Sequence, residues 1–287
     1  MRIQEKCIPC MVSQAIKVAD MAGLEEKDEL LRKVFSYLSK VDFKRSSTPE
    51  LTGEIFSLLK KETGNDDPYK ETRTHYNQMF LEQLPRLEQE IDRSEHPFLQ
   101  SVKYAIIGNI IDFNPVHALP AADIEACFER LKCEELEVDD TQLLGREICK
   151  ADTLLYLGDN CGEICLDMIL IKKIQRINPR CHIFFAVRGE AVVNDSVEAD
   201  AYAVGMDTYA TIVSNGDSSL GTVLHRTSRE FREIYEKADI IIAKGQANYE
   251  CLSEEKKNIF FLLMTKCRVI AEDIGVPEMK MICMKRI

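Results

Sequence analysis

One segment in the second half of the chain constrains the fold more than any other, because strand, turn and helix patterns follow one another directly. Leu154–Leu157 is a short apolar run of strand character, and a polar turn with Asp159 and Asn160 follows it. Between Ile164 and Ile177 apolar residues recur at helical spacing. In open α/β sheets such a turn lies at the carboxyl end of a strand, facing the crevice where ligands bind. We therefore expect a site at this turn.

Short β-rich runs alternate with helix-length segments through residues 151–287. This alternation predicts an α/β fold, in which a mainly parallel sheet forms the middle of a three-layer α/β/α arrangement. Residues 1–150 carry helical patterns and predict a helical N-terminal region, although its helices could still pack directly on the sheet. The expected strands are Leu154–Leu157, His182–Val187, Thr211–Ser214, Asp239–Ala243, Ile259–Met264 and Lys280–Met284.

The composition restricts the classes of partner. The formal net charge of −11 disfavours a broad nucleic-acid interface, which needs clustered Lys and Arg. No apolar run approaches membrane-spanning length, and the first residues lack the apolar core of a signal peptide, so we expect a cytoplasmic protein without membrane contact. The 11 cysteines fit reduced thiols better than a disulfide framework. Cys7 and Cys10 form one CxxC pair, which is either half a metal site or two structural thiols.

Oxygen-bearing side chains follow two neighbouring predicted strands. Asp159 and Asn160 come after the first strand, and Asp195 lies near the carboxyl end of the second. Carboxylate and amide oxygens that converge there would form an open site for a hard divalent cation such as Mg²⁺ or Mn²⁺. Each of these residues could instead cap the following helix, which is the common role of Asp and Asn at such positions. Their repetition at neighbouring strand ends favours the metal site.

Three further segments carry polar groups, and each has two interpretations. Asn109 and Asp112 lie on one face of an apolar helix, where they either satisfy a core network or face a site. The loop at residues 214–222 has two glycines around hydroxyl groups, which suits either an anion-binding nest or an ordinary helix cap. Lys244 follows an apolar strand and could face solvent or stabilise a transferring phosphoryl group.

The polar motifs of the predicted sheet match a known pattern when they are taken in order. They are residues 158–163 (Gly-Asp-Asn-Cys-Gly-Glu), 194–195 (Asn-Asp) and 244–249 (Lys-Gly-Gln-Ala-Asn-Tyr). Together they resemble the metal-dependent damage-control phosphatases, formerly a domain-of-unknown-function family. Residues 108–112 look like the helical Gly-Asn motif of that family, and the CxxC pair is similar to its prokaryotic branch. The resemblance spans essentially the whole chain.

The resemblance implies hydrolysis of small phosphate esters, such as sugar phosphates or damaged cofactor-like metabolites. It also implies an α/β/α sheet joined to a helical N-terminal portion. By this resemblance Asp159, Asn160 and Asp195 would bind a divalent metal (Mg, Mn, Co or Ni), and Lys244 would contact the phosphate. The side chains implied near the substrate are Asn109, Asp112, Glu163 and Asn248. The oligomeric state stays open.

The sequence leaves open two routes for the hydrolysis and two alternative functions. A metal-activated water could attack the phosphoryl group, or Asp159 or Asp195 could attack directly and form an aspartyl-phosphate. An S-adenosylmethionine-dependent methyltransferase is the rival enzyme, because residues 156–162 superficially look like a glycine-rich cofactor turn. Against it, Asp159 and Asn160 place side chains where that cofactor would approach. The non-enzymatic alternative is a metal-binding scaffold whose helical region contacts a partner.

Overall fold

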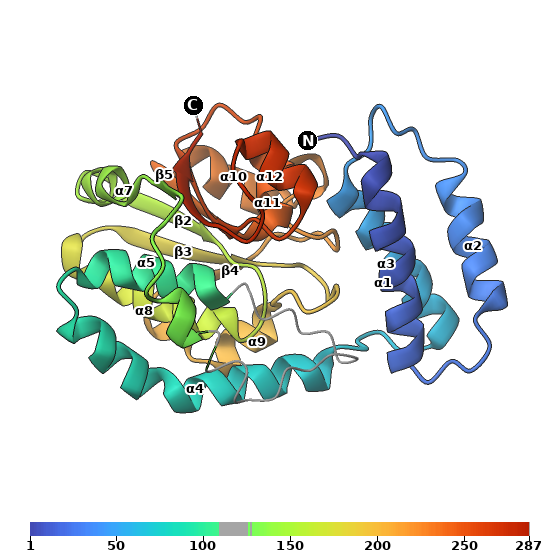
Figure 1. The fold of residues 1–287 in the computed structure, drawn as a ribbon, viewed down its shortest axis with the longest axis horizontal. Coiled ribbons are helices and arrows are strands. Elements are labelled where there is room, and N and C mark those ends of the chain that lie inside the picture. Colours follow the sequence, from blue (N-terminus) through green and yellow to red (C-terminus); the bar gives the residue numbers. More distant parts are fainter. Residues whose placement is uncertain (109–125, 127, 287) are drawn as a thin grey trace.

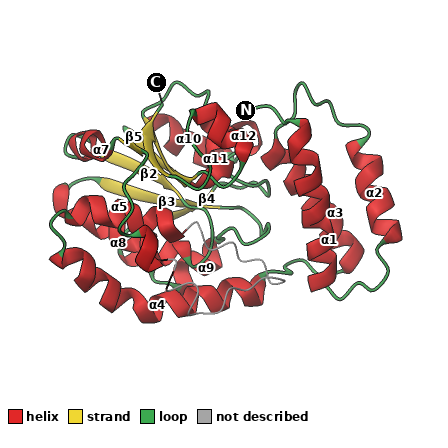
Figure 2. Ribbon diagram, in the orientation of Figure 1, coloured by secondary structure: helices red, strands yellow, loops and turns green. Residues whose placement is uncertain are grey.

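The computed structural model describes residues 1–108, 126 and 128–286, and these contain one sheet of seven strands in the order β1-β7-β6-β5-β2-β3-β4. Every neighbouring pair is parallel except β6 and β7. The predicted α/β fold with a mainly parallel sheet is confirmed (Figure 2). The strands are β1 (Val138–Asp139), β2 (Thr153–Leu157), β3 (His182–Val187), β4 (Thr211–Ser214), β5 (Ile240–Lys244), β6 (Ile259–Met264) and β7 (Met281–Lys285).

Helices precede the sheet and connect its strands. Helix α3 shows how local chemistry sets their limits: the Ser47 hydroxyl accepts from the backbone N–H of Glu50 at 3.4 Å, and Gly64 ends the helix at φ 65°. The α-helices are α1 (Ile8–Met21), α2 (Asp28–Leu38), α3 (Thr48–Thr63), α4 (Lys70–Arg93), α5 (Pro97–Ile107), α7 (Thr141–Ile148), α8 (Glu163–Ile177), α9 (Glu198–Ala203), α10 (Arg229–Lys237), α11 (Gly245–Leu252) and α12 (Arg268–Ile274).

The sheet is buried on both faces, and the two-residue period of its strands divides their side chains between two cores. Leu154 and Tyr156 of β2 belong to the core that includes residues of α4, α5 and α8. Leu155 and Leu157 belong to the core that includes residues of α10, α11 and α12. Figure 1 shows these helices on opposite sides of the strands. Because both faces are covered, the strands read as nearly continuous apolar runs.

Helices α1 to α5 divide into two groups. Helices α1, α2 and α3 share a separate core and stand at one end of the molecule (Figure 1). Helices α4 and α5 instead pack against α8 and contribute to the core of the sheet. Whether residues 1–150 and 151–287 fold independently stays a prediction. In the parts of the chain that the structure describes, no helix is both long and apolar enough to cross a membrane.

The strand order places a reversal of chain direction beside β2. From β2 the chain moves outward through β3 to β4, and it then returns to form β5 on the other side of β2. The connections after β2 and β5 therefore leave in opposite directions, and ligand sites of open α/β sheets form at such a point. The turns that follow β2, β3 and β5 carry the residues singled out from the sequence.

Candidate active site

The turn after β2 leaves the sheet through two glycines. The N–H of Gly158 donates to the carbonyl of Ala186 at 3.0 Å, and a Cβ on Gly158 would lie 2.8 Å from the Phe185 ring. Gly162 caps helix α8 at φ 79°, in the left-handed region that favours glycine. Asp159 and Asn160 lie between these two glycines, so the backbone of this turn fixes their positions.

The turn after β3 pairs with the turn after β2, which brings Asp195 beside Asn160. The two residues form an isolated antiparallel bridge. The backbone N–H of Ser196 donates to the Asp159 carbonyl at 2.9 Å, and its hydroxyl donates to the same oxygen at 3.0 Å. Cys161 N–H donates to the Asn194 carbonyl at 3.0 Å. The structure therefore brings Asp159, Asn160 and Asp195 together, while their ligation of a metal stays a prediction.

A strained residue precedes Asp195. Val193 has φ 47°, a backbone conformation that β-branched residues rarely adopt. Val192 is fully buried in the core of α1, α2 and α3, and Val193 packs against that core. Strain of this kind costs about 1–3 kcal/mol and persists where the surrounding packing enforces it. The helical end of the molecule therefore helps to hold the turn that carries Asp195.

Arg188 is a site residue that the sequence reasoning did not select. It follows the last residue of β3 and is 2% exposed. Its Nε donates to Oδ2 of Asp195 at 2.6 Å, and its NH2 lies 3.6 Å from Oδ1 of Asp159. We call Asp159, Asp195 and Arg188 the outer cluster. A basic residue directly after an apolar strand was the available signal, since a charge there needs a partner when it is buried.

The outer cluster and its surroundings carry more negative than positive charge. Asp159 is 6% exposed, and burial raises its pKa well above the usual range. The charges of Asp195 and Glu163 raise that pKa further, whereas Arg188 opposes the rise. A divalent cation beside these oxygens would stabilise the ionised carboxylates, so the donor set fits a hard, oxygen-preferring metal. Among the described residues no three His, Cys, Asp or Glu side chains form a metal centre, so the fit rests on two carboxylates and an amide.

Lys244 lies at the end of β5 within a second cluster of charges. Its Nζ donates to the Ala105 carbonyl at 2.8 Å and to Oδ1 of Asp167 at 2.7 Å, and it also pairs with Glu163. We call Lys244, Glu163 and Asp167 the inner cluster; all three side chains are fully buried. Burial alone would lower the pKa of Lys244, but the two carboxylates raise it above its usual value. The predicted contact of Lys244 with a phosphate stays a prediction.

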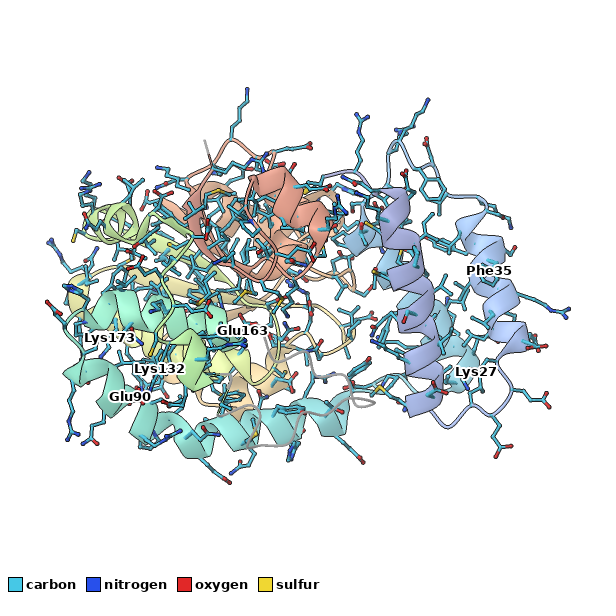
Figure 3. All side chains as sticks on the ribbon, in the orientation of Figure 1. Lys27, Phe35, Glu90, Lys132, Glu163 and Lys173 are labelled. Carbon is cyan, nitrogen blue, oxygen red and sulfur yellow. The ribbon has the colours of Figure 1, made fainter. Side chains whose placement is uncertain are left out.

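Glu163 connects the two clusters. One carboxylate oxygen faces Lys244, and the other accepts from the backbone N–H and side-chain amide of Asn160 at 3.4 and 3.5 Å. Figure 3 labels Glu163 within the α/β part of the molecule, away from Phe35 on α2. Asp167 lies one helical turn later, and its Oδ1 also accepts from the hydroxyl of Tyr156 at 2.6 Å. The N-terminal turns of α8 therefore supply groups to both clusters.

Asn248 links three connections at the carboxyl edge of the sheet. Its amide donates to the Gly158 carbonyl at 3.2 Å and to the Lys244 carbonyl at 2.8 Å. Its Oδ1 accepts from the Thr222 hydroxyl at 2.8 Å. Gly221 makes this approach possible, because a Cβ there would lie 2.6 Å from the Ala247 backbone. In the adjacent predicted nest, the Asn215 side chain accepts from Asp217 N–H, so part of that loop is already satisfied.

Two predicted site residues, Asn109 and Asp112, lie outside the described residues. Gly108, which precedes them, packs against α8: a Cβ there would lie 2.9 Å from Leu166 and 3.1 Å from Glu163. Cys7 and Cys10 lie at the start of α1, the first half-buried and the second exposed. Both are free thiols.

The fold and the site define an α/β protein with an oxygen-rich cluster at the carboxyl edge of its sheet. Residues 3–282 match the family described as the damage-control phosphatase ARMT1-like domain, and the chain belongs to this family. The family suggested by the sequence motifs is thus confirmed.

Relatives match over nearly their full length. A damage-control phosphatase of Pyrococcus horikoshii is 33% identical over 99% of this chain and 98% of the relative. A damage-control phosphatase of Archaeoglobus fulgidus is 32% identical over 96% of both chains. A crystal structure of a DUF89 family protein from Pyrococcus horikoshii covers 100% of both chains with a TM-score of 0.92 and 33% identity.

Proposed function

We propose that this protein is a metal-dependent phosphomonoester hydrolase that acts on small phosphometabolites. The observation that carries the proposal is the meeting of Asp159, Asn160 and Asp195 where β2 and β3 end, in a chain of the damage-control phosphatase family. The names of the two relatives support a phosphatase. These names favour a phosphatase over the methyltransferase and over the non-enzymatic scaffold. The cytoplasmic location stays a prediction.

Each residue of the site has a definite task under this proposal. Asp159, Asn160 and Asp195 would hold a divalent cation, which supplies charge stabilisation at a phosphoryl oxygen and acidifies bound water. Arg188 holds the two aspartates near each other through its contacts with Asp195 at 2.6 Å and with Asp159 at 3.6 Å. Glu163 orients Asn160 through its second carboxylate oxygen. Burial of these groups strengthens their electrostatic interactions with an anionic substrate and its cation.

Phosphate release from a panel of sugar phosphates and cofactor-derived phosphates tests the proposal. Metal-stripped protein is assayed with Mg²⁺, Mn²⁺, Co²⁺ and Ni²⁺ added back separately. We expect release that needs a metal and is lost in Asp159→Asn, since this change removes a charged ligand while keeping the shape. Asp66→Asn is the matched control, because Asp66 is exposed on the loop between α3 and α4. It should retain full activity.

The same proteins distinguish the phosphatase from the methyltransferase and the scaffold. Release that persists in Asp159→Asn would contradict the assignment of the site. Metal binding without turnover of any phosphate ester would favour the scaffold, and binding of S-adenosylmethionine would favour the methyltransferase.

A further inference from the structure

We propose that Arg73 and Asn77, one turn apart on α4, position the two turns that carry Asp159, Asn160 and Asp195. We call this pair the α4 clamp. The inference rests on the proposed function, because it gives these two residues a role in preparing the metal site. Both are distant from the site in sequence, and both are buried, at 3% and 4% exposure.

Asn77 holds the turn that follows β2. Its Oδ1 accepts from the backbone N–H of Gly162 at 2.6 Å. Gly162 caps α8, and backbone N–H groups in the first turn of a helix have no partner within the helix. The backbone carbonyl of Asn77 also accepts from the Cys165 thiol at 3.5 Å. Asn77 therefore fixes the start of α8 two residues after Asn160.

Arg73 holds the turn that follows β3. Its NH1 and NH2 donate to the two carboxylate oxygens of Asp67, each at 2.6 Å, and its Nε donates to Oδ2 of Asp200 at 2.9 Å. The same oxygen of Asp200 accepts from the N–H of Val197 at 3.1 Å, at the start of α9. Val197 lies two residues after Asp195 and bridges to Arg188. Arg73 thus fixes the chain on the far side of Asp195.

Cys161 lies where the two halves of the clamp meet. It follows Asn160, is fully buried, and interacts with both Asp200 and Asn77. The thiol has no exposed surface and is enclosed by the clamp, which protects it from alkylation. Its reactivity therefore reports whether the clamp is closed.

The arrangement matters because the two turns bring like charges together. The charges of Asp159 and Asp195 repel each other, and Arg188 contacts Asp195 more closely than Asp159. Helix α4 lies along α8 and contacts α9 (Figure 1). Because both clamp residues stand on this one rigid helix, it can keep the two turns from moving apart. Groups that orient metal ligands in this way affect metal affinity without touching the metal.

The test compares Asn77→Leu with Asn77→Asp in the full-length protein. The leucine has a similar shape but no acceptor for Gly162 N–H, whereas the aspartate keeps one. For Asn77→Leu we expect Mn²⁺ binding, measured by titration calorimetry, to weaken roughly 10-fold to 100-fold. Asn77→Asp should restore most of the affinity. Arg73→Lys, which keeps the charge but not the fork, should weaken binding in the same direction and tests the clamp if Asn77→Leu does not fold.

Alkylation of Cys161 by iodoacetamide, followed by mass spectrometry of peptides without added metal, gives the second readout. Asn77→Leu should speed alkylation of Cys161 several-fold and leave Cys283 unchanged, because Cys283 is fully buried in β7 away from the clamp. Leu84→Ala is the control for general destabilisation, since Leu84 is buried on the same helix among core residues. It should change neither the Mn²⁺ affinity nor the ratio of the two alkylation rates.

Three outcomes decide the inference. Unchanged Mn²⁺ affinity and unchanged Cys161 alkylation in Asn77→Leu would overturn it. An equal increase at Cys161 and Cys283 would also overturn it, because it would reveal general unfolding. Wild-type protein that binds no Mn²⁺ would contradict the proposed function instead, and the alkylation rates would still decide whether the clamp holds the turns.

Discussion

The outer and inner clusters have the same composition of charge, one cation with two carboxylates, yet the protein treats them differently. In the outer cluster Arg188 bonds closely to Asp195 and lies 3.6 Å from Asp159, and the adjoining Asn160 is half-buried. In the inner cluster Lys244 contacts both carboxylates and a backbone carbonyl, and no side chain of the cluster is exposed. The cation of the outer cluster therefore bonds closely to only one of its two carboxylates, whereas the cation of the inner cluster contacts both.

The comparison shows that net charge alone does not identify a ligand site. A buried carboxylate has to be compensated, either by the protein or by something that the protein binds. The inner cluster is compensated by Lys244 and by the Tyr156 hydroxyl. In the outer cluster Arg188 contacts Asp195 at 2.6 Å but lies 3.6 Å from Asp159, so its compensation of Asp159 is the weaker one. We therefore expect a bound metal to compensate for the loss of the cation in the outer cluster, whereas no metal should compensate for its loss in the inner cluster.

The largest effect on stability should come from removing the cation of the inner cluster. Lys244→Met leaves the carboxylates of Glu163 and Asp167 buried without their ammonium partner. Breaking a buried ion pair in this way costs about 3–5 kcal/mol, which urea unfolding of the metal-free protein would detect. Added Mn²⁺ should not restore the lost stability. Full rescue by Mn²⁺ would contradict the assignment of Lys244 to the inner cluster and would move it to the metal site.

Removing the cation of the outer cluster should cost less and should be reversible by metal. Arg188→Met leaves Asp159 and Asp195 without their guanidinium, which we expect to cost about 1–3 kcal/mol in the metal-free protein. A ligand that binds only the folded state raises stability by mass action. Mn²⁺ should therefore stabilise Arg188→Met more than wild type in parallel urea titrations. An equal gain in both proteins would show that Arg188 and the metal do not compensate the same charges.

The sequence predicted what local patterns control. All six predicted strands occur, since β-rich runs alternate with helical spacing. Among the described residues only the two-residue β1 was missed, because it is too short to show a pattern. Asp159 and Asp195 were expected to meet because parallel strands end at one edge of a sheet. The contacts of Arg188 with Asp159 and of Asn77 with Gly162 were not predicted, because the partners lie far apart in the sequence and meet only when turns and helices pack. No local pattern encodes those distances.

The direction of Lys244 could have been predicted but was not. Ile240 and Ile242 of β5 face the core that contains α8, and the two-residue period places Lys244 on the same face. Glu163 and Asp167, four residues apart, share one face of α8. The alternation therefore carried the signal for the inner cluster, whereas the position after an apolar strand left both solvent and a transferring phosphoryl group open as its surroundings.

A further effect, spread over several pH units, should appear as a difference in pH dependence. Burial raises the pKa of Asp167 to about 7, with Glu163 adding to the rise and Lys244 opposing it. In the unfolded chain the carboxyl ionises near its ordinary pKa of 3.8, so folding takes up a proton between these values. Wild type should thus lose stability relative to Asp167→Asn as pH rises from about 4 to 7, by at most about 1.4 kcal/mol per pH unit. Urea midpoints measured across this range should diverge, and parallel curves would contradict the shift.

The smallest effect should come from an exposed set of charges with the same composition. Lys33 on α2 pairs with Glu29 at 3.0 Å and with Glu62 at 2.6 Å, so it also joins one lysine to two carboxylates. Its side chain is 40% exposed, and solvent screens the interaction. Lys33→Met, the same substitution as Lys244→Met, should leave the urea midpoint unchanged within error. A loss comparable to that of Lys244→Met would mean that the number of partners, rather than their burial, sets the cost of removing a lysine.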